Sequence, residues 1–90
     1  MAFEFDEAKS RTNAAKHGID FVQAQQLWLD ALRLEVPART EGEPRWLLVA
    51  RIGDDHWSAI FAYRAENTRI ISVRGSRKEE IELYEDQAIR

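Results

Sequence analysis

The 90-residue sequence contains no cysteine, two prolines, four glycines and two histidines. The lack of cysteine excludes disulfide bonds, thiolate nucleophiles and zinc–thiolate sites. The low proline and glycine content, together with 44 % hydrophobic and 10 % aromatic residues, argues against a disordered or repetitive chain. A chain of this length builds one hydrophobic core, so we expect a single domain over residues 1–90.

The sequence also lacks a long apolar run. No stretch reaches the roughly 18 apolar residues that a membrane helix needs. The first six residues include two acids, where a signal peptide carries basic and then apolar residues. We therefore expect a soluble, unprocessed protein without membrane association, and the missing cysteines fit a cytoplasmic location.

Acidic residues outnumber basic residues, which gives a net charge of −3 at pH 7. That value is unusual for a nucleic-acid enzyme, since phosphate binding needs cations. Five of the 16 acids lie between residues 79 and 86, and subtracting those five leaves 11 acids against 13 basic residues. From Thr68 to Lys78 there are four basic residues and no acid. One cationic face is thus compatible with the acidic total, although it would steer RNA weakly at long range.

The first third of the chain is patterned for two helices. Asp6 is suited to cap a helix over residues 7–17, and Gly18 is suited to end it in the left-handed conformation. Asp20 begins a capping box, after which apolar residues recur at helical spacing over residues 21–31.

The hydrophobic period then changes from 3.6 to 2, which is typical of strands. Successive short turns predict an antiparallel meander, and a Ser76-x-x-Glu79 capping box predicts a last helix. Strands are expected over residues 3–5, 32–36, 45–52, 56–64 and 69–74. The predicted fold class is α+β: an antiparallel β-sheet with two N-terminal helices and one C-terminal helix.

Alternation gives each long strand an apolar and a polar face. In the last strand it assigns Ile71 and Val73 to the core and Ile70 to the opposite side. All three tryptophans fall on apolar faces and are expected in the core: Trp28, Trp46 and Trp57. Six residues form the polar sheet face: Arg45, Arg51, Ser58, Arg64, Ser72 and Arg74.

Several arginines on one rigid surface suit phosphate binding, because a guanidinium binds phosphate bidentately and stays charged. Arg74 is the sharpest candidate, since it lies at a strand end just before Gly75 and a helix N-terminus that favours anions. The alternative is an ordinary solvated sheet face, because exposed arginines are common.

Lys16 and His17 are candidates for proton transfer near neutral pH. Their place in the last turn of a helix also suits the helix dipole, so a structural role stays open. Glu80 and Tyr84 share a helix face and are suited to supply a base and a hydrogen bond, although Tyr84 equally suits the core. His56 is expected to be a plain surface residue. Without clustered ligands we expect no metal site and no cofactor.

Several short motifs, in this order and spacing, resemble the BrnT toxins of bacterial type II toxin–antitoxin systems. The match runs from Phe3 to about Glu85. The family patterns F-x-[WF]-D-x-x-K and N-x-x-K-H-G are matched by FEFDEAK (residues 3–9) and NAAKHG (13–18), followed by Phe21 and Ala24. Later patterns are matched by GEPRW (42–46), RIISVRGS (69–76), RKEE (77–80) and Tyr84–Glu85.

The resemblance implies a RelE-like fold and metal-independent RNA cleavage that inhibits translation and growth. It also implies neutralisation by a BrnA-like ribbon-helix-helix antitoxin, through which alone operator DNA would be bound. The catalytic candidates are Lys16, His17, Arg45, Arg74, Glu80 and Tyr84. The RNA-binding candidates are Arg51, Arg64, Arg69, Arg77 and Lys78.

The mechanism expected is attack of the RNA 2′-hydroxyl on its own phosphate. Arg74 and Arg45 would stabilise the developing charge, and His17 or Lys16 would transfer protons. Two departures from the family pattern reduce positive charge: Gly75 replaces a basic residue, and the last helix carries Glu79 and Glu82. The alternative function is therefore a catalytically inactive, toxin-like module that holds an antitoxin or another protein partner.

Overall fold

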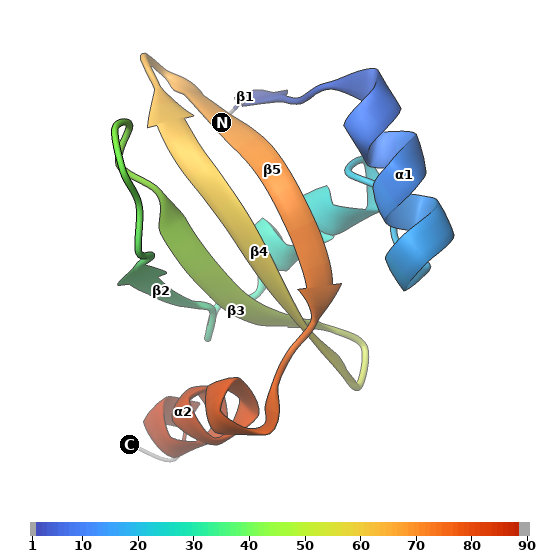
Figure 1. Ribbon diagram of the computed structural model, residues 1–90. Helices are drawn as coiled ribbons and strands as arrows, with labels where there is room; N and C mark the ends of the chain where they lie inside the picture. The colour runs from blue at the N-terminus through green and yellow to red at the C-terminus, as the bar shows by residue number, and fades with distance from the viewer. Residues whose placement is uncertain (1, 89–90) are drawn as a thin grey trace.

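The computed structural model describes residues 2–88 as an α+β structure with a five-stranded sheet and three helices (Figure 1). In chain order the elements are β1 (Ala2–Glu4), α1 (Glu7–His17), the 3₁₀ helix η1 (Gln23–Leu29), β2 (Leu34–Pro37), β3 (Trp46–Ile52), β4 (Asp55–Arg64), β5 (Asn67–Gly75) and α2 (Lys78–Ala88). The predicted α+β class is confirmed. No helix within residues 2–88 has the length and apolar character needed to cross a membrane.

The sheet is mixed, with the strand order β1-β5-β4-β3-β2. The strands β2 to β5 form the predicted antiparallel meander, but β1 pairs in parallel with β5. The expectation of a purely antiparallel sheet was therefore wrong. The chain leaves β1 through α1 instead of a hairpin, and its later return beside β1 as β5 sets the parallel direction.

The ends of α1 match the sequence prediction. The Lys9 backbone N–H donates to Asp6 Oδ1 at 3.1 Å, and Gly18 has a left-handed φ of 77°. At this φ a side chain is strained, so glycine suits the helix end.

The second predicted helix is a shorter 3₁₀ helix. Its capping box forms as expected: Asp20 N donates to Gln23 Oε1 at 2.9 Å and Gln23 N donates to Asp20 Oδ1 at 2.7 Å. The helix ends at Leu29 instead of residue 31. A period of three aligns Ala24 and Leu27, both fully buried, toward the sheet.

The core lies between η1 and one face of the sheet. Trp28 contacts Phe3 and Phe61 edge-on, with ring centroids 5.1 and 5.2 Å apart. Trp28 is buried, and Trp46 and Trp57 are partly buried against the same cluster, which confirms the core assignment of the tryptophans.

A β-bulge in β5 changes which isoleucine enters the core. Ile60 pairs with Ser72 while Phe61 pairs with Ile70, so Ile71 is the extra residue. Ile70 and Val73 are therefore both in the core, and the assignment of Ile71 to the core was wrong. Strict alternation cannot anticipate a bulge, because the extra residue shifts the side-chain period by one.

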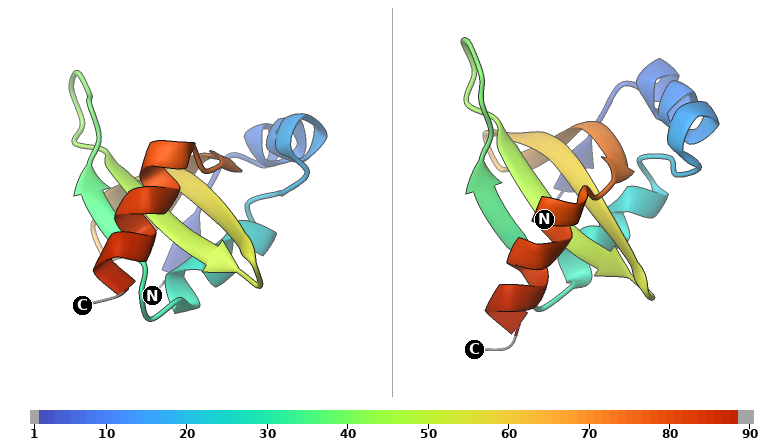
Figure 2. Two further views of the ribbon diagram at one scale, coloured as in Figure 1. Left: turned by 90° about the horizontal axis from the view of Figure 1, so that it is seen from below. Right: turned by 60° about the horizontal axis from the view of Figure 1, so that its bottom comes forward.

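The helix α2 lies across the opposite face of the sheet (Figure 2). Val49 and Ser58, on that face, are each only 1 % exposed. The predicted polar face is therefore partly covered, and only some of its side chains meet solvent.

Candidate functional site

Arg74 and Glu80 form a bidentate ion pair where β5 leads into α2. Arg74 Nη1 and Nη2 donate to Glu80 Oε1 and Oε2 at 2.8 and 2.9 Å. The two side chains retain only 28 % and 13 % of their exposure. Arg74 is thus held rigidly. Its charge is compensated by Glu80, which lies four residues after Ser76 in the first turn of α2.

Two more donors hold the Glu80 carboxylate. The Ser58 hydroxyl and the Arg77 backbone N–H both donate to Glu80 Oε1 at 2.8 Å. The Ser76 hydroxyl lies 2.8 Å from that of Ser58. The predicted Ser76–Glu79 capping box was wrong by one position: Glu80 bonds back to the helix start, because this also lets it reach Arg74.

The hydrogen bonds from Arg74 lower the pKa of Glu80 to about 2, although partial burial opposes the shift. The same bonds raise the pKa of Arg74 above its ordinary value. Glu80 is therefore ionised at neutral pH and is a poor proton acceptor. The opposite charges of Arg74 and Glu80 therefore compensate each other at neutral pH.

A second cluster lies in a hollow of about 240 Å³ between α1 and β5. Its lining includes three basic side chains, Lys9, Lys16 and His17, together with Ser72. None of the described residues that line it is acidic. We call this hollow the cationic groove.

The cationic groove is kept in place by Asn13. Its Oδ1 accepts the Val73 backbone N–H at 3.1 Å, and its Nδ2 donates to the Ile19 carbonyl at 2.8 Å. Asn13 is 7 % exposed, so both bonds are shielded from water. They fasten α1 to the part of β5 that extends beyond β1.

Sequence reasoning missed Lys9 as a groove residue. The signal was present, because Lys9, Asn13 and Lys16 recur at i, i+4 and i+7 and so share one helix face. Arg11 lies on the opposite face of α1 and is absent from the groove lining.

The sheet brings Arg74 near the cationic groove. Ser72 lines the groove, and Arg74 lies two residues further along the same strand and on the same face. That spacing is roughly 7 Å. Lys16, His17 and Arg74 therefore all lie along the second half of β5.

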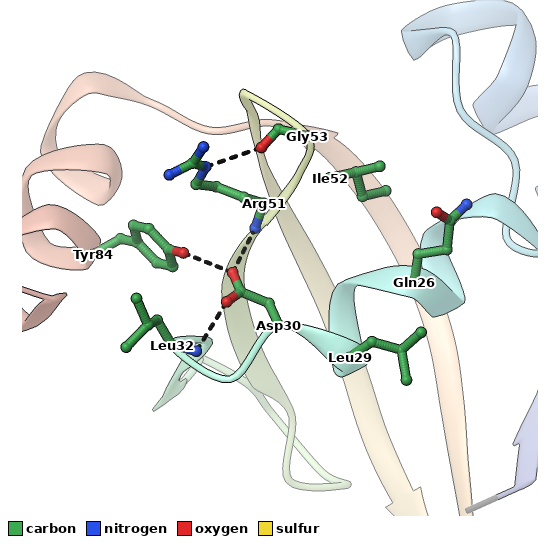
Figure 3. A pocket seen from close by; sticks show the side chains of 8 residues that line it. All are labelled: Gln26, Leu29, Asp30, Leu32, Arg51, Ile52, Gly53 and Tyr84. Atoms are coloured by element: carbon green, nitrogen blue, oxygen red, sulfur yellow. Dashed lines mark hydrogen bonds between the residues drawn. The ribbon is translucent and has the colours of Figure 1, made fainter.

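Tyr84 lies elsewhere, in the contact between α2 and the end of η1 (Figure 3). Its hydroxyl donates to Asp30 Oδ2 at 2.7 Å, and the Arg51 backbone N–H donates to the same atom at 2.9 Å. Tyr84 is 2 % exposed. Burial, with the hydrogen bond to Asp30, raises the pKa of Tyr84 to about 12. The structure does not bring its hydroxyl together with Arg74.

His56 supports the same helix. Its Nε2 lies 2.7 Å from Glu85 Oε1, and its ring meets that of Tyr84 edge-on at 5.3 Å. The His56 side chain is 16 % exposed, so the expectation of a plain surface residue was wrong. The turn after β3 places His56 beneath α2. The residues around His56 do not indicate this burial.

Arg45 is exposed just before β3, far from Arg74 along the sheet. Val49, Ser58 and Arg74 form one row across the sheet, and Arg45 lies four residues from Val49, or roughly 13 Å. The structure therefore does not bring Arg45 and Arg74 together.

Three other candidate arginines each hold a carboxylate. Arg51 pairs with Asp54 at 3.2 Å, Arg64 with Glu43 at 3.2 Å and Arg69 with Glu4 at 3.0 Å. Arg77 and Lys78 are exposed at the start of α2, next to the Arg74–Glu80 pair.

Within residues 2–88, no three His, Asp or Glu side chains are arranged to hold a metal ion. The search of curated proteins gave no match. The family model described as "Ribonuclease toxin, BrnT, of type II toxin-antitoxin system" matches residues 5–80. This match covers most of the chain, including α1, the whole meander and Glu80. The chain belongs to the BrnT family of ribonuclease toxins of type II toxin–antitoxin systems.

Proposed function

We propose that this protein is a metal-independent endoribonuclease that cleaves RNA at the cationic groove. Cleavage would inhibit translation and growth in the cytoplasm, and a BrnA-like ribbon-helix-helix antitoxin would neutralise it. Operator DNA would be bound only through that antitoxin. The order of strands and helices is compatible with a RelE-like fold, which we propose for the chain.

The observation that carries this proposal is the convergence of Lys9, Lys16 and His17 on one groove without a lining carboxylate. The two lysines at this hollow attract an anion such as an RNA phosphate. Of these groups, His17 carries an imidazole, the side chain that most often serves as a general acid or base.

In the proposed mechanism, the groove positions the phosphate whose neighbouring 2′-hydroxyl attacks it. His17 accepts the proton of the 2′-hydroxyl as the new oxygen–phosphorus bond forms. The bond from phosphorus to the 5′-oxygen then breaks, and that leaving oxygen takes up the proton from His17. Lys16 and Arg74 stabilise the charge that develops on the phosphate. Glu80 orients Arg74 and does not exchange protons, because its pKa is about 2. Arg45 lies outside this groove and would act only on RNA that extends beyond the groove. Tyr84 would act only if α2 moved.

The remaining basic candidates would serve as phosphate contacts further along the RNA. Arg77 and Lys78 are the nearest to Arg74 in the chain. At Arg51, Arg64 and Arg69 an RNA phosphate would compete with the acidic partner that each already holds.

The test is cleavage of an end-labelled RNA by the purified protein in EDTA. Substitutions His17→Ala and Lys16→Ala should each slow cleavage by roughly 10²-fold or more, by analogy with lost transition-state donors. Both residues are exposed, so folding should persist. Arg11→Ala is the matched control, since it removes a charge from the opposite face of α1.

Wild-type cleavage that resists EDTA and depends on His17 and Lys16 would support the proposal. Equal loss in Arg11→Ala would instead indicate a general charge effect, and cleavage that needs added metal would contradict metal independence. A cell-free translation reaction with the same variants would test whether RNA cleavage stops protein synthesis.

The second candidate function is an inactive toxin-like module that only holds a protein partner. The bidentate Arg74–Glu80 pair favours it, because Glu80 occupies the donors that a phosphate would use. Complete absence of cleavage by a folded wild-type protein that still binds its antitoxin would select this function.

A further inference from the structure

We infer that an RNA phosphate binds to one particular edge of the Arg74 guanidinium, formed by Nε and Nη2, and that buried Ser58 is a positioning residue for this edge. The inference rests on the ribonuclease function proposed above. It specifies how Arg74 meets the substrate, and it adds a residue that acts on the reaction without touching RNA.

The ion pair with Glu80 leaves part of Arg74 available. A guanidinium carries five N–H groups in a planar fork. Nη1 donates to Glu80 Oε1 and to the Gly75 carbonyl at 2.8 and 3.3 Å, and Nη2 donates to Glu80 Oε2 at 2.9 Å. The hydrogen bonds described for residues 2–88 thus leave one N–H on Nε and one on Nη2. Both lie on the same side of the planar group, which we call the side edge.

The side edge suits a phosphate. Two N–H groups in one plane match two phosphate oxygens, which is the bidentate geometry that arginine favours. The Arg74 side chain keeps 28 % of its exposure although Glu80 holds its other edge. Ser72, two residues earlier on the same strand and face, lines the cationic groove. A phosphate at that end of the groove would therefore meet Arg74 through the side edge.

Ser58 holds the carboxylate that fixes Arg74. Ser58 and Arg74 are partners in the register between β4 and β5, so their side chains are neighbours on the sheet face that α2 crosses (Figure 2). Ser58 is 1 % exposed, and its hydroxyl donates to Glu80 Oε1 at 2.8 Å. The orientation of Arg74 therefore depends on Ser58 through Glu80.

The hydrogen bonds of Glu80 favour positioning over masking. If Glu80 masked Arg74, a phosphate would have to displace the carboxylate. Glu80 Oε1 also accepts the Ser58 hydroxyl and the Arg77 backbone N–H. Displacement would remove the acceptor of these two donors as well, which costs free energy. Glu80 therefore stays in place and keeps the side edge in a fixed direction.

The experiment compares Glu80→Gln with Glu79→Gln, which removes the same charge from the neighbouring position of α2. Glu79 is exposed, and both oxygens that hold Arg74 belong to Glu80. Single-turnover cleavage of an end-labelled RNA gives the rate constant. Titration with a 2′-O-methyl RNA of the same sequence, which lacks the attacking hydroxyl, gives the affinity.

We expect Glu80→Gln to cleave roughly tenfold more slowly, because a loosely held guanidinium is misplaced for the transition state. It should also bind the 2′-O-methyl RNA more weakly than Glu79→Gln does. Glu79→Gln should cleave at least as fast as wild type, since it only removes a charge that repels phosphate.

Ser58→Ala tests the positioning residue. It should slow cleavage in the wild-type background and have no further effect in an Arg74→Ala background, because Ser58 acts only through Arg74. A merely structural role would slow cleavage equally in both backgrounds. Thr68→Val is the matched control, because it removes a hydroxyl from a residue that is also 1 % exposed, near the other end of β5.

Faster cleavage or tighter binding in Glu80→Gln than in Glu79→Gln would overturn the inference, because Glu80 would then mask Arg74. Equal losses for Ser58→Ala in both backgrounds, or the same loss for Thr68→Val, would overturn the role of Ser58. If Glu80→Gln fails to fold, Arg74→Lys decides. Lysine keeps the charge beside Glu80 but has no side edge, so wild-type cleavage by Arg74→Lys would refute that edge.

The two measurements separate this inference from the proposed nuclease. A wild-type protein that binds the 2′-O-methyl RNA but cleaves no RNA would contradict the nuclease alone. The affinity of Arg74→Lys would then decide, because unchanged binding would refute the side edge and weaker binding would support it. Absent binding by the wild type would overturn both proposals.

Discussion

At the scale of single residues, the candidate site depends on side chains whose hydrogen bonds fix the positions of neighbouring groups. Glu80 receives hydrogen bonds from Arg74, Ser58 and the Arg77 backbone. Asn13 serves two backbone groups that would otherwise be buried without partners. Such residues are costly to lose, because their removal leaves shielded polar groups unsatisfied.

The first prediction concerns Glu80→Gln. The substitution replaces the bidentate ion pair with at most a neutral hydrogen bond, so the free energy of unfolding at pH 7 should fall by about 2 kcal/mol. Chemical denaturation of the two proteins at one pH measures this difference.

The pH dependence has a defined sign. Glu80 has a pKa of about 2 when folded, below its ordinary value of 4.5. Its contribution to stability is therefore present above about pH 4.5 and is lost as the pH falls toward 2. The difference between wild type and Glu80→Gln should shrink over that window. A difference that stays constant down to pH 2 would show that Glu80 is not the group responsible.

At the scale of elements, α2 is fastened by contacts from several parts of the chain. Tyr84 bonds to Asp30 after η1, His56 pairs with Glu85, and Gln87 Nε2 donates to the Leu32 carbonyl. Part of the negative charge of α2 thus stabilises the fold, here through Glu85. The acidic residues of α2 also reduce the positive charge available to RNA.

The second prediction is that Tyr84→Phe loosens α2. It removes one of the three donors to the Asp30 carboxylate and should lower the free energy of unfolding by about 1–2 kcal/mol. Hydrogen exchange of α2 amides should accelerate more than that of β4. Leu83→Ala, at an exposed neighbouring position, should change stability by less than about 0.5 kcal/mol. Equal effects of the two substitutions would argue against the Asp30 contact as an anchor.

At the scale of the whole molecule, the net charge of −3 is combined with a local cationic groove. Binding of RNA should therefore depend on a few close contacts and only weakly on long-range attraction.

The third prediction follows from this charge distribution. The logarithm of the RNA association constant should fall with the logarithm of salt concentration by roughly 0.7 for each phosphate neutralised on a single strand. Lys16→Ala should reduce the slope by about that amount, whereas Arg11→Ala should leave it unchanged. Fluorescence titrations of a labelled RNA at several salt concentrations measure the slopes. A reduction for Arg11→Ala alone would move the binding face to the other side of α1.

Local structure was largely predictable because it depends on neighbouring residues. Asp6 and Gly18 mark the ends of α1, and alternation marks the three long strands, so the α+β class and the tryptophan core followed from the sequence. The family motifs are equally local, so the resemblance can be recognised from the sequence alone. Lys16 and His17 were selected as candidates for the same reason, because they are adjacent residues before a helix-ending glycine.

Only the tertiary structure decided how distant side chains meet. It placed β1 parallel to β5, inserted the bulge at Ile71 and laid α2 over part of the polar face. It also paired Arg74 with Glu80 and separated Arg45 from both. These outcomes depend on packing between segments far apart in the chain, where a one-residue shift or a helix crossing changes which side chains share a surface. The sequence by itself therefore determined the elements and the candidate chemistry, and the packing of those elements decided which candidates lie together.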